Sequence, residues 1–162
     1  MNISKLFMVI GVYLIFLAFV CTEATPCTNG WVLYGEKCYF YSTFEETWNA
    51  ASAYCQAFNS KLAEPTTQEE VVFLSQQAVQ TVNDSTYFIG VTDAFLEGEW
   101  VYASSRIPLK VTIPWTNTGS DHNQEKDFVA IDTLPPVNGQ YIKKTSKDTS
   151  KFICEYSLEY VS

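Results

Sequence analysis

The sequence predicts an α+β fold, because its helical patterns lie in the first half and its strand patterns in the second. Apolar residues recur at helical spacing between Trp48 and Val82. From Tyr87 onward the chain consists of short runs rich in aromatic and β-branched residues, which favour strands. Because helices and strands do not alternate, a doubly wound parallel sheet is not expected. The length of 162 residues suits one domain.

The N-terminus has the composition of a secretory signal peptide. Lys5 precedes an uncharged apolar run at 6–20, which is shorter than the ~20 residues that a membrane-spanning helix needs. Small and polar residues follow, and we place cleavage after Ala24. This predicts a signal peptide over 1–24 and a domain over 25–162, whose core covers about 27–156. The mature protein is then expected to be secreted and extracellular, without insertion into a membrane; an uncleaved signal anchor is the alternative.

Four cysteines lie beyond the predicted signal peptide: Cys27, Cys38, Cys55 and Cys154. An even number of cysteines in an oxidising compartment favours two disulfides, for which three pairings are possible. No C-x-x-C pair is present and the chain has one histidine, so a structural zinc site is not expected.

The first part of the predicted domain indicates a hairpin followed by a helix. Aromatic runs at 31–34 and 37–41 flank a Gly-containing turn. Thr43 with Glu46 forms a capping-box pattern, and Thr47 is a rival N-cap for the same helix. The residues that follow at helical spacing on one face are Trp48, Ala51, Cys55 and Phe58.

A second helix is expected after Pro65, because Thr67 with Glu70 offers another capping box. Its inward face is predicted to carry Val71, Leu74, Ala78 and Val82. Strands are expected at 87–91, 99–102, 128–131, 140–142 and 152–156. The segment 104–126 is rich in turn residues, and long loops of this kind usually carry function.

Several motifs cover nearly all of the predicted domain. They are Gly30-Trp31, Cys38-Tyr39-Phe40, Thr47-Trp48-x-x-Ala51-x-x-x-Cys55, Lys61-Leu62-Ala63-Glu64-Pro65, Phe88-Ile89-Gly90-Val91, Thr92-Asp93, Glu97-Gly98-x-Trp100 and Phe152-Ile153-Cys154-Glu155. Together they resemble the C-type lectin-like domain family, in the secreted, single-domain, long form typical of invertebrates. The resemblance implies a C-type lectin-like fold in which two helices flank antiparallel sheets with a long loop region. It also implies the disulfides Cys27–Cys38 and Cys55–Cys154.

The chain departs from the family at a second bridge that usually joins the late strands. Its half-cystines would fall at Phe128 and Ser146, and both are missing. The loss of both leaves no orphan thiol, so a count of four cysteines stays consistent with two disulfides. We therefore expect the long-loop region to be less constrained than in relatives.

The usual calcium-dependent sugar site is also missing from the sequence. In the family, a Trp is followed by Glu-Pro-Asn or Gln-Pro-Asp, and the next strand carries Trp-Asn-Asp, because calcium takes about six to eight oxygen ligands. Here Trp115 is followed by Thr-Asn-Thr-Gly-Ser-Asp121-His122, without a proline, and the strand has Tyr141-Ile142-Lys143. The comparison with the family thus predicts neither a metal at the sugar site nor another cofactor.

Asp93 and Glu97 match two ligands of the family's auxiliary calcium site, which Asp121 or Glu125 could join. Two carboxylates fall short of a full oxygen shell. The same residues could instead cap turns, which is the interpretation we favour.

The ligand face is expected to carry Trp115, Asp121, His122, Lys143 and Lys144. Four lysines gather near it in a chain of net charge −8: Lys143, Lys144, Lys147 and Lys151. They would attract sulfated, phosphorylated or carboxylated glycans. Alternatively, they protect a solvated edge strand from aggregation. The four aromatic residues that could stack on a sugar are Trp100, Tyr102, Trp115 and Tyr141, most of which we expect in the core.

We predict a secreted carbohydrate-binding or pattern-recognition protein that is not an enzyme. The excess of acidic residues argues against nucleic-acid binding, and no nucleophile or paired-carboxylate frame is present. The resemblance implies glycans or microbial surfaces as partners, in innate immunity. The alternative is a lectin-like domain that binds a protein or another non-sugar ligand. Asn83, in Asn83-Asp84-Ser85, is a predicted glycosylation site.

Overall fold

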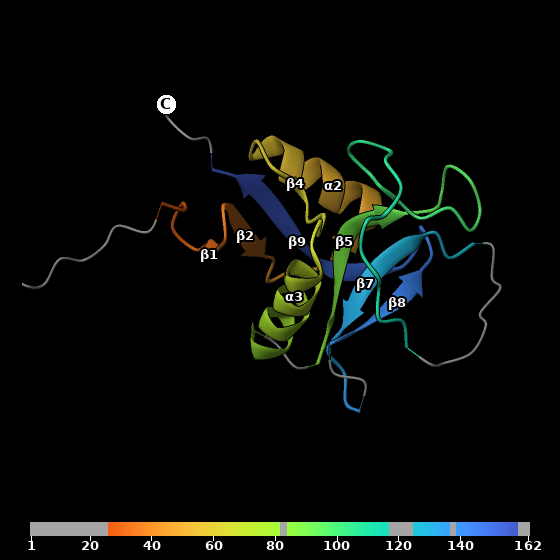
Figure 1. Cartoon of the computed structure of the whole chain (residues 1–162). Coiled ribbons are helices and arrows are strands. Elements are labelled where there is room, and N and C mark those ends of the chain that lie inside the picture. The colour runs from red at the N-terminus through yellow and green to blue at the C-terminus, as the bar shows by residue number, and fades with distance from the viewer. Residues whose placement is uncertain (1–25, 82–83, 117–124, 137–138, 159–162) are drawn as a thin grey trace, which may run out of the picture.

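The computed structural model describes residues 26–81, 84–116, 125–136 and 139–158. Within them, two helices pack against a nine-stranded sheet, as predicted for an α+β fold (Figure 1). The elements are β1 (Val32–Tyr34), β2 (Lys37–Tyr41), β3 (Glu46–Thr47), α2 (Trp48–Ala57), β4 (Lys61–Leu62), α3 (Gln68–Thr81), β5 (Thr86–Thr92), β6 (Val101–Tyr102), β7 (Phe128–Asp132), β8 (Gln140–Lys144) and β9 (Thr149–Ser157). The predicted signal peptide, Val82, Asn83, Asp121 and His122 lie outside the described residues.

The last strand holds the sheet together. The strand order is β1-β2-β9-β5-β7-β8, with β3 and β4 also paired to β9 and β6 paired to β5. β9 runs antiparallel to β2 and parallel to β5, where Tyr87 lies opposite Lys151. The sheet is therefore mixed at this pair and antiparallel at the other strand pairs of the described residues. Because β9 lies next to β2, the last described strand packs beside the N-terminal hairpin (Figure 1).

Helix α2 begins at the second of its two candidate caps. The Thr47 hydroxyl accepts a hydrogen bond from the Ala50 N–H at 3.4 Å, so Thr47 and not Thr43 is the N-cap. The prediction that Phe58 lies on the buried face is wrong, since its side chain is 57% exposed. The helix ends at Ala57, and the chain turns away at Asn59 with a positive φ of 52°.

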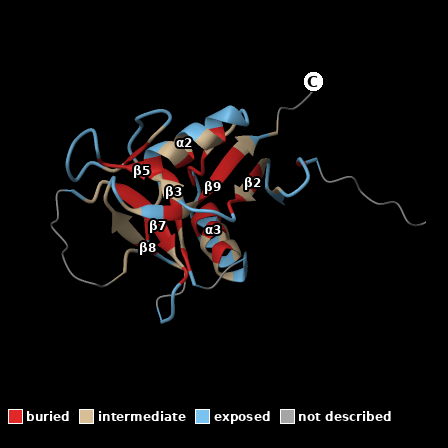
Figure 2. Cartoon of the chain, turned by 180° about the vertical axis from the view of Figure 1, so that it is seen from behind, coloured by how far each residue is buried: buried red, intermediate tan, exposed pale blue. Residues whose placement is uncertain are grey.

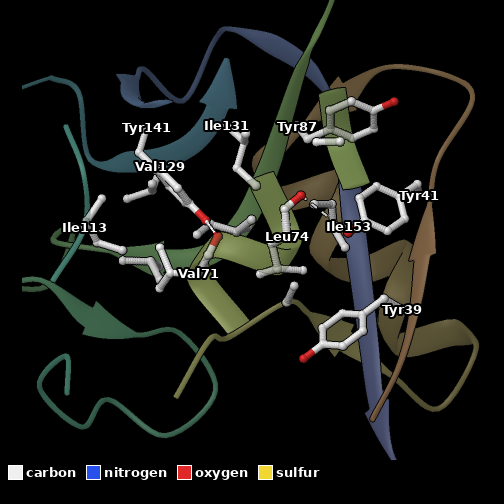
Figure 3. Close-up of a cluster of buried hydrophobic side chains, with 14 of the residues drawn as sticks. Tyr39, Tyr41, Val71, Leu74, Tyr87, Ile113, Val129, Ile131, Tyr141 and Ile153 are labelled. Atoms are coloured by element: carbon white, nitrogen blue, oxygen red, sulfur yellow. Dashed lines mark hydrogen bonds between the residues drawn. The ribbon is translucent and has the colours of Figure 1, made fainter. Parts of the chain in front are cut away.

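Helix α3 begins with the predicted capping box. The Glu70 N–H donates to the Thr67 hydroxyl, and the Thr67 N–H donates to the Glu70 carboxylate, both at 3.2 Å. Its inward residues pack against β2, β5, β7 and β9 (Figure 3). Several tyrosines share this core. The hydroxyls of Tyr102 and Tyr141 donate to backbone carbonyls, of Pro65 at 2.7 Å and of Val71 at 2.8 Å. Figure 2 shows that buried residues are concentrated in β5, β7 and β9.

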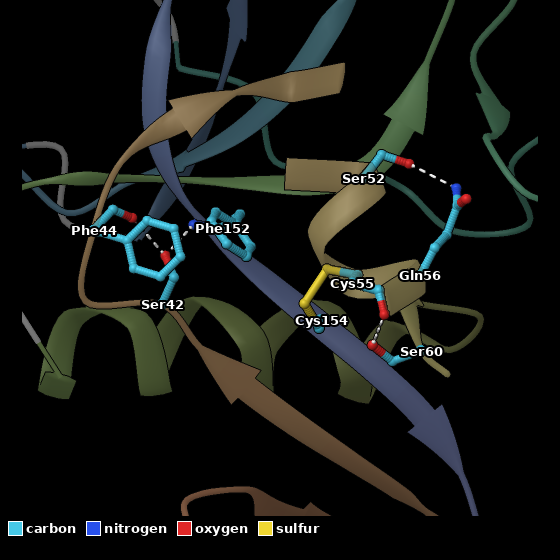
Figure 4. The surroundings of a disulfide bond; sticks show 8 residues. All are labelled: Ser42, Phe44, Ser52, Cys55, Gln56, Ser60, Phe152 and Cys154. Atoms are coloured by element: carbon cyan, nitrogen blue, oxygen red, sulfur yellow. Dashed lines mark hydrogen bonds between the residues drawn. A yellow bond between two sulfur atoms is a disulfide. The ribbon is translucent and has the colours of Figure 1, made fainter. Parts of the chain in front are cut away.

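The structure contains the two disulfides that the family resemblance implies. Cys27–Cys38 closes the N-terminal hairpin, and Cys55–Cys154 joins α2 to β9 (Figure 4). Phe128, at the position of a missing half-cystine, is 6% exposed, and its ring centre lies 4.7 Å from that of Trp48. Aromatic packing thus occupies the place where relatives have a covalent link.

Candidate functional site

Four separate segments meet at the end of the sheet that carries the long loop. Asp93 follows β5, and its N–H donates to the Asp127 carbonyl at 3.1 Å just before β7. Trp100 precedes β6. Trp115 runs beside Tyr141 of β8 in a parallel bridge, and Lys143 lies two residues further along that strand. We call Asp93, Trp100, Trp115 and Lys143 the long-loop cluster.

Lys143 lies over two aromatic rings. Its ammonium nitrogen is 5.1 Å from the ring centre of Trp100 and 5.8 Å from that of Trp115. The two rings lie 5.1 Å apart and are tilted by 52°. The negative faces of indole rings attract a cation, and this attraction strengthens when water is partly excluded. Because all three side chains are half-buried, the ammonium is held by the rings more firmly than a fully exposed lysine would be.

Asp93 closes the β5–β6 turn. Its carboxylate is 2% exposed, and Oδ2 accepts a hydrogen bond from the Gly98 N–H at 3.1 Å. Gly98 has a φ of 81°, which favours glycine at this point of the turn. Oδ1 is buried without a hydrogen-bond partner among the described residues. These contacts agree with the turn-capping interpretation of Asp93.

The charges around Asp93 oppose one another. Burial raises the pKa of Asp93, and the neighbouring carboxylates of Glu97 and Asp127 raise it further. The Gly98 hydrogen bond and the positive charge of Lys143 lower the pKa of Asp93. Lys143 is therefore electrostatically coupled to this buried carboxylate as well as to the two rings.

The described residues do not fit the calcium site that the fold family implies. Nowhere among them do three or more His, Cys, Asp or Glu side chains gather in a way that could hold a metal ion. On β8, Ile142 has no side-chain oxygen, and the ammonium of Lys143 would repel a cation. Asp93 offers one unpartnered oxygen, whereas Glu97 is exposed on the turn.

The predicted basic cluster is spread over two parts of the sheet. Lys143 and Lys144 lie on the edge strand β8, and Lys147 is exposed in the turn that follows. Lys151 lies on β9, with its ammonium 5.9 Å from the Tyr87 ring centre. Of the four candidate stacking aromatics, Tyr102 and Tyr141 are 4% and 0% exposed and belong to the core. Trp100 and Trp115 remain as half-buried rings in the long-loop cluster.

A second group of charges was not anticipated from the sequence. Three buried carboxylates and two lysines meet between β2, β4, β9 and the start of α3. This buried charge cluster consists of Lys37, Lys61, Glu64, Glu70 and Glu155. Lys37 Nζ lies 2.8 Å from Glu70 and 3.5 Å from Glu155, while Lys61 pairs with Glu64 and lies 3.6 Å from Glu155. The only sequence signal was that Lys61, Glu64 and Glu155 fall within family motifs.

The carboxylates of the buried charge cluster have opposite pKa shifts. Burial raises the pKa of Glu155 to about 7, although Lys37 and Lys61 lower it in part. Burial also raises the pKa of Glu70, but hydrogen bonds from Lys37 and Thr66 outweigh this effect and bring its pKa below the usual value. The neighbouring Tyr39 donates its hydroxyl proton to Glu70 at 3.2 Å. The cluster thus links the sheet to α3 through charge-assisted hydrogen bonds.

In the described residues two disulfides fix a mixed sheet, and aromatic and charged side chains gather where the loops meet. The family model of the lectin C-type domain matches residues 44–156, and the chain belongs to this family. Its members bind carbohydrate and are not enzymes, which confirms that part of the prediction.

Similar proteins come from several animals. Lectin BRA-3 of Megabalanus rosa is 27% identical over 161 residues, which cover 98% of this chain and 95% of BRA-3. The carbohydrate-recognition domain of the mouse scavenger receptor C-type lectin has 25% identity and a TM-score of 0.70, covering 82% of this chain and 99% of that domain. The lectin domain of murine dendritic cell inhibitory receptor 2, solved with an N-glycan, shares the fold with a TM-score of 0.70, 21% identity, and coverage of 81% and 98%.

In the part of the chain that the structure describes, neither helix has the length and apolar character needed to cross a bilayer. The predicted signal peptide and secretion therefore stay predictions.

Proposed function

We propose that this chain is a secreted lectin that recognises glycans without the usual calcium-dependent sugar site. Its family supports glycan binding. The observation that carries the calcium independence is the position of Lys143, whose ammonium lies over Trp100 and Trp115 beside the Asp93 carboxylate. A positive side chain at this point opposes the entry of a divalent cation.

Anionic glycans are the ligand class that this surface favours. Lys144 and Lys147 lie on and after the edge strand β8, next to the long-loop cluster. The chain carries a net charge of −8, so a local group of lysines creates a positive field that selects and orients a sulfated, phosphorylated or carboxylated glycan. Half-buried Trp115 and Trp100 can add contacts with a sugar ring.

Binding to sulfated and neutral glycans on an array, in calcium and in chelator, tests the proposal. We expect binding to sulfated or uronic-acid glycans that persists in chelator and weakens with salt, because the Debye length falls from about 10 Å at 0.1 M to about 3 Å at 1 M. Lys144→Ala with Lys147→Ala should reduce the affinity at least several-fold. Lys151→Ala, on β9, is the matched control and should have a smaller effect.

Two other outcomes of the glycan array would argue against the proposal. Calcium-dependent, salt-tolerant binding to mannose or galactose would contradict the proposal and indicate a metal site that includes residues beyond those described. If no glycan binds, a protein ligand becomes the better candidate. Exposed Phe95, Leu96 and Ile107 favour that second function, since Arg106 lies 4.6 Å from the Phe95 ring centre and gives the apolar surface a charged rim.

Secretion and processing can be tested on the expressed full chain. N-terminal sequencing of the protein from the medium should begin at Thr25, after cleavage of residues 1–24. Treatment with an N-glycosidase should lower the apparent mass if Asn83 carries a glycan. Retention of the protein in membranes would instead support the signal-anchor alternative. A role in innate immunity would require binding to intact microbial cells.

A further inference from the structure

The long-loop cluster joins segments that are far apart in the chain. Asp93 ends β5, Trp100 begins the path into β6, Trp115 lies beside β8, and Lys143 belongs to β8. Neither disulfide reaches this end, since both link residues of the hairpin, α2 and β9. The half-cystine position at Phe128, at the start of β7, is filled by an aromatic contact with Trp48 of α2. Backbone hydrogen bonds join neighbouring segments here, such as the Asp93 N–H to the Asp127 carbonyl and the Tyr141 N–H to the Pro114 carbonyl. Side-chain contacts between the segments add to these backbone links.

Lys143 makes non-covalent contacts with the two tryptophans of the long-loop cluster and acts electrostatically on Asp93. Its nitrogen lies within cation–π distance of both rings, at 5.1 and 5.8 Å. Its charge acts on Asp93, whose Oδ1 is buried without a hydrogen-bond partner among the described residues. A buried carboxylate oxygen without a donor is costly unless a positive charge lies nearby. One ammonium therefore attracts two indole rings and offsets in part the effect of burial on the pKa of Asp93.

We propose that Lys143 is a tethered cation that organises the ligand-binding end of this lectin in place of a bound metal ion. It positions Trp100 and Trp115 relative to each other, and its positive charge acts on the buried Asp93. The inference deepens the proposed calcium-independent recognition, on which it rests. The two proposals assign different roles to the lysines. Lys143 acts on the protein's own residues, whereas Lys144 and Lys147 supply the contacts to the glycan.

The directions of their side chains support different roles for Lys143 and Lys144. Lys143 and Lys144 are consecutive on β8, so their side chains point to opposite faces of the sheet. Lys143 is opposite Val129 and Lys144 is opposite Phe128 in the pairing with β7. The two rings lie under Lys143, and no aromatic ring within the described ranges is in cation–π contact with Lys144. Lys144 is therefore a matched control for charge and strand position.

The test compares Lys143→Met, Lys143→Arg and Lys144→Met in chelator. Methionine keeps the unbranched stem and removes the charge, whereas arginine keeps the charge and stacks on indole rings. We expect Lys143→Met to lower the Tm by about 3–6 °C and to increase quenching of Trp fluorescence by acrylamide, because the rings separate. Lys143→Arg should restore most of both properties, and Lys144→Met should change neither. In an Asp93→Asn background, Lys143→Met should cost much less, since the buried negative charge is gone.

The outcomes separate this inference from the proposed function. If Lys143→Met matches Lys144→Met in Tm and quenching, the tethered-cation inference is wrong, and any loss of glycan binding then identifies Lys143 as a ligand contact. If Lys143→Met behaves as expected but wild-type protein binds no anionic glycan, the inference stands and the proposed ligand class fails. Should Lys143→Met not fold, Lys143→Gln and the Asp93→Asn single variant provide the same comparison. Failure of arginine to rescue would also overturn the inference, because any cation of similar reach should serve.

Discussion

The buried charge cluster and the long-loop cluster use lysine in different ways. In the first, Lys37 and Lys61 are surrounded by three carboxylates and their role is to satisfy buried anions. In the second, Lys143 lies over two indole rings and is coupled to one carboxylate. The first arrangement fixes β2, β4, β9 and α3, whereas the second joins the ends of strands and loops. Charge pairing thus supports the fold at one end, and charge–aromatic contact joins the long-loop segments at the other.

The largest effect is expected at Lys37. Lys37→Met removes the ammonium that lies 2.8 Å from Glu70 and 3.5 Å from Glu155. The two buried carboxylates then lose the positive charge that Lys37 supplies. Removal of one partner of a buried ion pair typically costs about 3 kcal/mol or more. Urea denaturation at pH 8 should show this loss. Lys147→Met, in an exposed turn, is the control and should change stability by less than about 0.5 kcal/mol. Similar losses in the two variants would show that the cluster contributes little.

The next effect concerns pH, because Glu155 has a folded-state pKa of about 7, above its unfolded value of about 4.3. Between these values the native state binds a proton that the unfolded state releases, so stability falls as pH rises from about 4.5 to 7. We expect a decrease of about 3 kcal/mol, because one pKa unit corresponds to about 1.4 kcal/mol. Below about pH 4 the opposite shift of Glu70 takes over, since protonation of its lowered-pKa carboxylate removes its pairing with Lys37. Stability should therefore be greatest near pH 5.

Denaturation of wild type and Glu155→Gln across pH 4–8 checks this expectation. The variant should be nearly independent of pH above 5, and more stable than wild type at pH 8. A wild-type stability that rises between pH 5 and 8 would show that Glu155 remains ionised.

The smallest effect is expected from calcium. A ligand that binds only the native state at a hundredfold excess over its Kd would stabilise by about 2.7 kcal/mol. Because Lys143 places a positive charge in the long-loop cluster, we expect the Tm in excess calcium and in chelator to agree within about 1 °C. Differential scanning fluorimetry suffices for this measurement. A rise of several degrees with calcium would identify Asp93 and Glu97 as ligands and reverse the contrast between the two clusters.

Local sequence signals predicted the two helices well. They failed for features that depend on tertiary structure, such as the end of α2 and the pairing of distant strands. Thr67 and Glu70 form the expected capping box because both partners lie within one turn. Phe58 matched the helical spacing, but the helix ended one residue earlier, and sequence spacing cannot show where a chain leaves the helix. The mixed character of the sheet was also missed, because the parallel β5–β9 pair joins residues 64 positions apart, such as Tyr87 and Lys151.

The sequence singled out the members of the long-loop cluster as candidates, but it did not indicate their contacts with one another. Lys143 and Trp115 were both expected on the ligand face, but their positions in the sequence did not indicate that the ammonium lies over the ring. Lys37, Glu70 and Glu155 come from three elements, and their burial together depends on the completed sheet. A charged residue in a sequence is by default a surface residue. Buried pairing of this kind becomes visible only with the fold.

The distribution of disulfides has a consequence for the behaviour of this protein toward reductants. Cys55–Cys154 spans 99 positions and ties α2 to the strand on which β2, β3, β4 and β5 all pair. In the chain-entropy model, a loop of this length contributes about 4.7 kcal/mol to stability. Neither disulfide lies in the long-loop cluster, so a reducing thiol would not react with the contacts of that cluster. It would instead break the Cys55–Cys154 bond and destabilise β9, on which the sheet depends. Loss of binding under reduction should therefore coincide with global unfolding rather than precede it.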